Sequence, residues 1–364
     1  MNVVVGVTKF NDRTGSEVYC LELVKALRAA GHEVEVFALY SSREGREELE
    51  SLGARLCTYP KPLSLVPDRV VSMQPLATAL LLSRVGRSVP ALSVIHGVIP
   101  GEAPVRAARI DRFVAVSPFV ADHLVGVEGL LRDDVTVIPN GIDLERFDAR
   151  RTIEPADPVR VLWASTYLPL RHQALVSLAQ GVLEGARTEL TVVDDRLPSG
   201  LLPESDRIRV VPKGRSIVDL IGEHDVVAGL GPGRILLEGL AMNRAALCLN
   251  VDGLAEYMDG CNVERLEYYR ETWGGPVARL LDPAVVLANQ NRRAVAEANY
   301  DASANVARVV QELEGLTRRE RAPLGYRLTT VRRLPALARD YALIPWLKRR
   351  LRVAPLRPVL GGRP

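Results

Sequence analysis

The sequence predicts an α/β protein with two doubly wound domains, each built on a parallel sheet. Short β-branched runs alternate with amphipathic helical segments, and repeated strand–helix units form parallel sheets with helices on both faces. The alternation is interrupted at the polar, proline-containing stretch 147–158 and then resumes. A length of 364 residues is long for one core and comfortable for two.

The first predicted domain covers residues 1–150. It opens with a strand at 3–7 and a helix at 16–30, in which Leu21, Val24 and Leu27 recur at helical spacing. Gly31 and His32 end this helix and lead into the next strand. Further strands are predicted at 33–39, 54–58, 69–72, 91–95, 112–116 and 135–138, and further helices at 43–52, 75–84 and 118–125.

The second predicted domain covers residues 151–316. Asp282 followed by Pro283 is typical of a helix N-cap and first helical position, so residues 282–316 are predicted to be largely helical. Strands are predicted at 159–164, 190–193, 208–211, 226–228 and 245–249, and helices at 171–185, 216–221 and 234–242.

A short segment, 135–147, lies where the two predicted domains meet. Its β-branched start predicts a buried strand, Pro139 ends that strand, and Asn140-Gly141 tolerates positive φ, so a turn is expected. The whole segment resembles the domain-linking signature of retaining family 4 glycosyltransferases. The resemblance extends over residues 1–316 and implies the GT-B fold, in which two Rossmann-like domains face a cleft. The first domain would bind the acceptor and the second the nucleotide-sugar.

Composition and cysteine spacing favour a globular cytoplasmic protein. Hydrophobic residues make up 47% and charged residues 25% of the chain, which excludes wholesale disorder. The four cysteines are far apart and form no Cys-x-x-Cys or Cys/His cluster, so we expect reduced thiols rather than disulfides or zinc ligands. No signal peptide or membrane span is expected. Forty-two arginines against five lysines favour a bacterial source, in which envelope polysaccharide or secondary-metabolite biosynthesis is a fitting role.

In the first predicted domain, candidate ligand-binding residues follow the strands. Gly15 and Ser16 start a helix directly after the first strand, where free backbone N–H groups attract anions or sugar hydroxyls; the alternative is a simple helix cap. His96 ends a buried strand, and a lone histidine there is often structural. The resemblance to the family implies that Gly15 and Ser16 belong to a glycine loop that faces the sugar-diphosphate. It also implies that His96 hydrogen-bonds a hydroxyl of the donor sugar.

In the second predicted domain, Gly233 and Arg234 follow a strand and begin a helix. Bare N–H groups and a guanidinium at this position make a diphosphate cradle. Glu238 lies four residues further on the same helical face, so an Arg–Glu pair that only decorates the helix is the alternative. The resemblance implies that Glu238 binds the ribose hydroxyls of the nucleotide.

The sequence departs from the family pattern in three places, one of which is Ala241-Met-Asn-Arg-Ala245 where Ala-x-Gly-x-Pro is usual. The other two concern charged residues. Family members commonly carry a first glutamate seven residues before the second, but here Leu230 occupies that position, as in a subset with a Gly-x-Gly-Arg form. The arginine usually found near Ser165 is also missing, while Arg171 aligns with the family's lysine. Diphosphate neutralisation would therefore depend on Arg171 and Arg234, with Lys213 or Arg215 as further candidates.

The resemblance implies a retaining glycosyltransferase that moves a sugar from a UDP-, GDP- or other nucleotide-diphosphate donor to a hydroxyl acceptor. With Leu230 unable to act as a nucleophile, front-face displacement is expected, in which guanidinium groups stabilise the leaving diphosphate without a metal ion or cofactor. Two alternatives stay open: a degenerate GT-B protein that binds a nucleotide-sugar or a partner without turnover, and a peripheral membrane scaffold.

The residues from 317 to 364 form a basic, apolar tail. Thirteen Arg or Lys against two acids give it a charge of +11, which leaves −8 on the rest of the chain. Within 327–363, apolar residues next to cations resemble a segment that docks on an anionic membrane, here the inner face of the plasma membrane. An ordered cover over the first domain and a flexible solvated tail are the alternatives. Nucleic-acid binding is not expected, because no stacking aromatics lie on a basic sheet.

Overall fold

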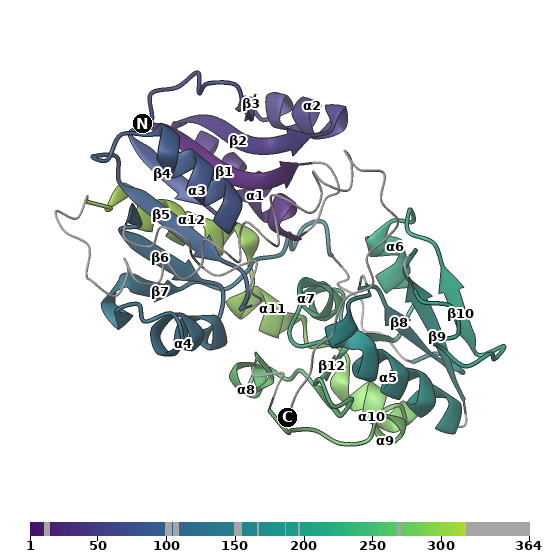
Figure 1. Ribbon diagram of the computed structural model, residues 1–364. Coiled ribbons are helices and arrows are strands. Elements are labelled where there is room, and N and C mark those ends of the chain that lie inside the picture. Colours follow the sequence, from purple (N-terminus) through teal and green to yellow (C-terminus); the bar gives the residue numbers. More distant parts are fainter. Residues whose placement is uncertain are drawn as a thin grey trace, which may run out of the picture. The chain divides into compact units, whose positions relative to one another are not determined.

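The computed structural model describes residues 1–10, 15–98, 104, 109–148, 155–165, 167–185, 187–195, 197–267 and 271–317. The chain forms two units, each with its own sheet (Figure 1). The first unit contains residues 1–116 and 120–136, and the second contains 117–119 and 137–310. The chain returns to the first unit from Gln311. Most of the basic tail, 318–364, lies outside the described residues, as does part of the predicted linker, 149–154.

The first unit contains a seven-stranded sheet in the order β3-β2-β1-β4-β5-β6-β7, and its pairs from β3 to β6 are parallel. Its predicted strands and helices are confirmed, with ends shifted by at most three residues. The strands are β1 (Asn2–Phe10), β2 (Glu33–Ser41), β3 (Arg55–Thr58), β4 (Arg69–Ser72), β5 (Ala91–Ile95), β6 (Arg112–Ala115) and β7 (Val135–Val137), and the helices are α1 (Gly15–Ala29), α2 (Arg43–Ser51), α3 (Pro75–Arg84) and α4 (Pro118–Gly126).

The second unit contains a six-stranded sheet in the order β10-β9-β8-β11-β12-β13, parallel except for β13 at one edge. The strands are β8 (Val159–Trp163), β9 (Thr188–Val193), β10 (Ile208–Val211), β11 (Val226–Leu230), β12 (Ala245–Leu249) and β13 (Ala255–Tyr257). The helices are α5 (His172–Glu184), α6 (Ile217–Gly222), α7 (Arg234–Ala241), α8 (Val263–Glu267), α9 (Val277–Leu280), α10 (Pro283–Asn289), α11 (Arg293–Asn299) and α12 (Ala302–Glu314).

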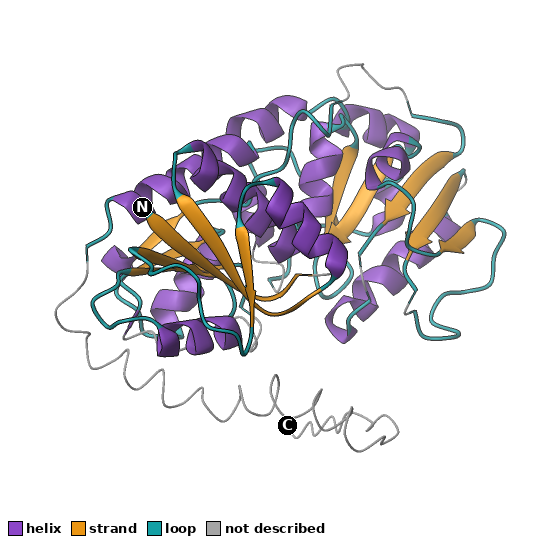
Figure 2. Ribbon diagram, turned by 90° about the horizontal axis from the view of Figure 1, so that it is seen from above, coloured by secondary structure: helices purple, strands orange, loops and turns teal. Residues whose placement is uncertain are grey.

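Helices cover both faces of each sheet (Figure 2). In the second sheet, side chains that alternate along β8 enter different cores: Leu162 packs in one cluster, and Val161 and Trp163 pack in the other. The period of two in a strand sends neighbouring side chains to opposite faces, so a strand buried on both sides is apolar throughout. Both units therefore have the doubly wound, Rossmann-like architecture that the sequence predicts.

The unit boundaries differ from the predicted ones at 150/151 and 316. The predicted division places 282–316 wholly in the second domain, whereas α12 starts in the second unit and ends in the first. Glu314 Oε1 lies 2.9 Å from His32 Nε2, and Glu312 lies 3.5 Å from Arg112, so polar contacts hold this end of α12 in the first unit. The spacing of apolar residues alone does not reveal such contacts.

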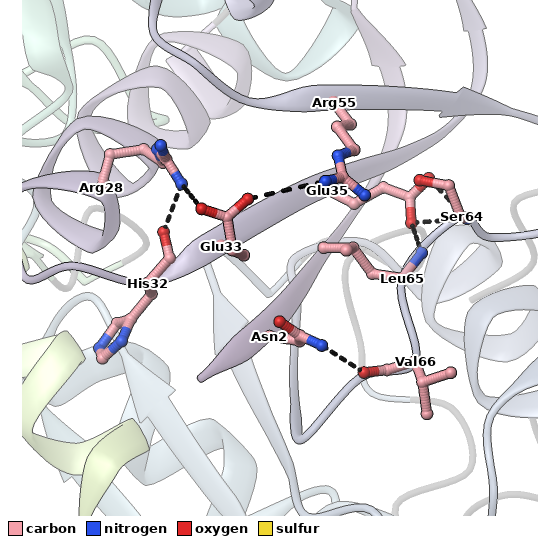
Figure 3. A network of polar contacts seen from close by, with 9 residues as sticks. All are labelled: Asn2, Arg28, His32, Glu33, Glu35, Arg55, Ser64, Leu65 and Val66. Carbon is pink, nitrogen blue, oxygen red and sulfur yellow. Dashed lines mark hydrogen bonds and ion pairs between the residues drawn. The ribbon is translucent and has the colours of Figure 1, made fainter.

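Polar side chains connect the amino ends of the strands of the first sheet (Figure 3). The buried carboxylate of Glu35 accepts hydrogen bonds from the backbone N–H groups of Ser64 and Leu65, both at 2.9 Å, and from the Ser64 hydroxyl. Beside it, exposed Glu33 pairs with Arg28 at 2.7 Å. These contacts join neighbouring segments at the amino edge, so they stabilise the fold at the edge opposite to the predicted ligand site.

The four cysteines are free thiols, as predicted, and three of them are buried. None of the helices in the described ranges combines the length and the apolar character that crossing a bilayer requires.

Candidate functional site

In the first unit, the start of α1 follows β1 at the carboxyl edge of the sheet. Gly15 is the first residue of α1, and Ser16 is the second. The Ser16 hydroxyl accepts a hydrogen bond from the side-chain amide of Gln74 at 3.0 Å, and the Gln74 carbonyl oxygen accepts the backbone N–H of Thr8 near the end of β1. Gln74 thus joins the segments after β4 and β1 around Ser16. Its position directly after a predicted strand was the only sequence signal for this role.

His96 follows β5 at the same edge of the first sheet. Its ring meets the ring of Tyr19 edge to face, with centroids 4.8 Å apart and planes at 79°. Tyr19 lies one turn after Ser16 on α1 and is buried, and this burial raises the pKa of its hydroxyl far above the usual range. The aromatic contact fixes the orientation of the imidazole. The structure thus places Ser16 and His96 on segments connected through α1.

In the second unit, the predicted cations lie beyond the carboxyl ends of adjacent strands. Lys213 follows β10, Arg171 lies in the segment after β8, and Arg234 follows β11. Because these strands and β9 are neighbours in the order β10-β9-β8-β11, the segments that follow them share one edge of the sheet. Ligands of open α/β sheets bind at this edge.

The glycine turn before α7 has the predicted form. Gly231 has φ +62°, Gly233 is the N-cap, and Arg234 is the first helical residue. The Arg234 guanidinium donates a hydrogen bond to the Gly141 carbonyl at 2.6 Å, and its Nε lies 3.7 Å from Glu238 Oε1. Both side chains are largely buried, with exposed fractions of 17% and 12%. Arg234 and Glu238 are therefore brought together, and both belong to a network that includes the signature segment.

The signature segment is held by a second arginine that the sequence interpretation missed. Arg293, at the start of α11, donates hydrogen bonds to the carbonyls of Leu144, Phe147 and Ala241 at 2.6 to 2.9 Å. Two of these carbonyls belong to the signature segment and one belongs to α7, so Arg293 joins the signature segment to α7. The sequence offers no local pattern for it, because its acceptors lie far away along the chain.

Gly141 is needed for a reason other than the one predicted. Neither Asn140 nor Gly141 is among the described residues with positive φ, so the expected positive-φ turn is wrong. Instead, a Cβ on Gly141 would lie 2.1 Å from the Cα of Ala302. A backbone passing this close leaves no room for any side chain.

At Leu230 and Ser165, where the family pattern would have a charged residue, the structure places uncharged groups. Leu230 ends β11 and packs partly buried against a core cluster. The carbonyl of Ser165 accepts a hydrogen bond from the Trp163 indole at 3.3 Å. Among the described residues, Arg171, Lys213 and Arg234 follow the strand ends, and Arg215, a further candidate after β10, is paired with Glu223.

Comparison with known proteins relates this architecture to glycosyltransferases. Residues 13–146, most of the first unit, match the family model described as Glycosyltransferase Family 4. No curated protein matches the chain.

Solved structures share the fold at low sequence identity. A glycosyltransferase from Rickettsia africae ESF-5 has a TM-score of 0.62 and 16% identity, over 86% of this chain and 97% of that one. Anabaena Alr3699/HepE, solved in complex with UDP-glucose, has a TM-score of 0.61 and 15% identity, over 87% and 100%. A putative UDP-N-acetylglucosamine 2-epimerase from Listeria monocytogenes has a TM-score of 0.51 and 15% identity, over 89% and 99%.

These likenesses define the fold as GT-B, with two Rossmann-like domains. Because an epimerase and transferases share it, the fold by itself does not define the reaction. The family match over the first unit supports glycosyl transfer.

Proposed function

We propose that this protein is a retaining glycosyltransferase that moves a sugar from a nucleotide-diphosphate donor to a hydroxyl acceptor. The observation that carries the proposal is the match of residues 13–146 to Glycosyltransferase Family 4. The cations at the carboxyl edge of the second sheet support it, because a diphosphate needs positive groups at such an edge.

The donor would bind mainly to the second unit. Arg171, Lys213 and Arg234 would neutralise the diphosphate, the N–H groups after Gly233 would contact it, and Glu238 would accept hydrogen bonds from the ribose. The similar fold of Alr3699/HepE, which was solved with UDP-glucose, supports a nucleotide-sugar as the ligand class. For this ligand to bind, Arg234 would exchange its bond to the Gly141 carbonyl for one to the phosphate.

The proposed chemistry is a front-face displacement. The acceptor oxygen bonds to the anomeric carbon on the face from which the diphosphate leaves, and the acceptor proton passes to the departing phosphate oxygen. Leu230 has no carboxylate for a covalent intermediate, so stabilisation of the developing negative charge would be the main catalytic effect. Guanidinium and ammonium groups, rather than a metal ion, would supply it. Gly15 and Ser16 would face the sugar-diphosphate, and His96 would orient a sugar hydroxyl.

A donor screen followed by two substitutions tests this proposal. Thermal shift with a panel of nucleotide-sugars identifies the donor, because a ligand specific for the folded state raises the melting temperature. With that donor, Arg234→Ala or Glu238→Ala should abolish transfer while the protein remains folded. Arg209→Ala, which removes an arginine from β10, is the control. Full transfer activity of the Arg234→Ala variant would refute the proposed donor site.

A second candidate function is binding of the nucleotide-sugar without turnover. The observation that favours it is the engagement of Arg234 with Gly141 and Glu238, which gives both side chains a structural role. Donor hydrolysis and transfer, measured with and without acceptor beside calorimetric binding, distinguish the two. Donor binding without any product would support the second candidate.

For the basic tail, we propose peripheral contact with an anionic membrane surface. Its charge of +11 carries this proposal. Co-sedimentation with phosphatidylserine-containing vesicles should disappear when the chain is truncated after Leu316, and unchanged binding of the truncated protein would refute it.

A further inference from the structure

A buried carboxylate, Asp194, lies at the carboxyl end of the middle one of three adjacent strands. It follows β9 directly, and β9 lies between β10 and β8 in the sheet. Its side chain is only 1% exposed. Burying a carboxylate is costly unless hydrogen bonds and countercharges compensate, so its contacts indicate what it does.

The contacts of Asp194 reach the segments that follow both neighbouring strands. Oδ2 accepts the backbone N–H of Tyr167, which lies in the segment between β8 and α5. Oδ1 lies 3.9 Å from the ammonium of Lys213, which follows β10. One side chain therefore connects the segment that leads to Arg171 with the segment that carries Lys213.

The adjacent residue strengthens the connection on the β10 side. The Asp195 carboxylate accepts the backbone N–H of Lys213 at 2.9 Å, and Gly214 has φ +131°, which suits glycine. Lys213 is thereby held at its backbone by Asp195 and at its ammonium by Asp194. On the β8 side, the Tyr167 hydroxyl lies 3.2 Å from His172 Nδ1, next to Arg171.

A second buried carboxylate shows what a purely structural role looks like. Asp225 precedes β11 at the opposite, amino edge of the same sheet and accepts the backbone N–H groups of Ala156 and Arg160 at 3.1 and 2.8 Å. Both aspartates satisfy backbone donors. They differ in which segments they hold, because only Asp194 holds segments at the edge where the ligand would bind.

We infer that Asp194 is a positioning residue for the phosphate-binding cations Arg171 and Lys213. The inference rests on the proposed function, because Asp194 would support the donor-binding site of that function. By ordering both segments before the ligand arrives, Asp194 reduces the entropy that binding would otherwise lose. No local pattern in the sequence indicates this role, because the bond to Tyr167 joins residues 27 positions apart.

The test compares Asp194→Ala with Asp225→Ala, the matched loss of a buried carboxylate at the other edge. Hydrogen exchange is followed in peptides covering 165–171, and calorimetry gives the Kd for UDP, GDP, ADP and dTDP. We expect Asp194→Ala to speed exchange in 165–171 and to raise the Kd by about tenfold, the size expected for a lost hydrogen bond to a charged group. Asp225→Ala should melt at a lower temperature yet bind the nucleotide like the wild type.

Asp194→Asn keeps the proposal testable if the alanine variant does not fold. Its amide oxygen can still accept the Tyr167 N–H, whereas the attraction to Lys213 is lost. We therefore expect protected exchange in 165–171 and a Kd raised by about threefold, the scale of a half-exposed ion pair.

The outcomes separate this inference from the proposed function. Suppose that the wild type binds a nucleotide but that Asp194→Ala shows unchanged exchange in 165–171 or an unchanged Kd. That result overturns the inference and leaves the proposed function intact. A wild type that binds none of the four nucleotides overturns the proposed function instead.

Discussion

Gly141→Ala tests why the signature segment contains a glycine at this position. The added Cβ would lie 2.1 Å from Cα, 2.7 Å from N and 2.8 Å from Cβ of Ala302. No side-chain rotation relieves contacts with backbone atoms, so one of the two segments must move. Because Gly141 does not have positive φ, the cost arises from this contact and not from backbone strain.

The structure gives the size of the effect. The two segments are joined by hydrogen bonds from Ile142 N to the Tyr300 carbonyl, at 2.8 Å, and from Ala302 N to the Ile142 carbonyl, at 3.0 Å. Separating them loses both bonds, at about 1 kcal/mol each, and exposes part of the fully buried Ile142 side chain. Alanine also reduces the conformational entropy of the unfolded chain relative to glycine, which offsets about 0.5 kcal/mol of this loss. We expect a loss of about 3 kcal/mol in the free energy of unfolding, which is within the range for overpacking a buried site.

Urea unfolding of the full chain measures this loss. Gly275→Ala in the same unit is the control, because a Cβ there meets no atom within 4 Å and the φ of Gly275 is not positive. The control should unfold at the wild-type midpoint, and Gly141→Ala at a clearly lower one. Equal midpoints for both variants would refute the close-approach explanation.

Two other predictions concern buried carboxylates. Burial raises the pKa of Glu267 to about 8, so its contribution to stability is complete at pH values below about 4.5 and is lost as the pH rises toward 8. Glu267→Gln should remove up to about 1.4 kcal/mol per pH unit of this decline, measured by unfolding at pH 5.5 and 7.5. Exposed Glu204→Gln is the control, and an unchanged slope in Glu267→Gln would contradict the burial argument. In the first unit, Glu35→Gln should lower the free energy of unfolding by about 2 kcal/mol, because an amide group would face the N–H of Ser64. The same change at exposed Glu33 should leave stability near that of the wild type, and equal losses at the two positions would show that burial is not the cause.

Much of the fold follows from local pattern. Parallel strands buried on both faces are nearly continuous apolar runs, so the strands from 3–7 to 245–249 are visible in the sequence. The N-cap at Asp282 was also predictable, and its carboxylate accepts the Ala284 N–H at 2.9 Å. β13, α8 and α9 were missed, because they have three to five residues and are stabilised by packing rather than by their own periodicity.

The candidate site was predictable only in part. Residues placed directly after strands, such as Lys213 and Arg234, were identifiable because parallel strands end at one edge. Gln74, Asp194 and Arg293 were not, because each acts on segments more than fifteen residues away. Hydrogen bonds of this kind have no local signature.

The sequence by itself determined the two doubly wound units, their order along the chain and the residues that follow each strand, since these depend on the local periodicity of apolar residues. Only the tertiary structure decided which side chains those residues meet. It showed Arg234 bonded to Gly141, Asp194 connecting the segments after β8 and β10, and α12 ending in the first unit. Such contacts depend on how distant segments approach one another in space, and neighbouring residues in the sequence do not encode that approach.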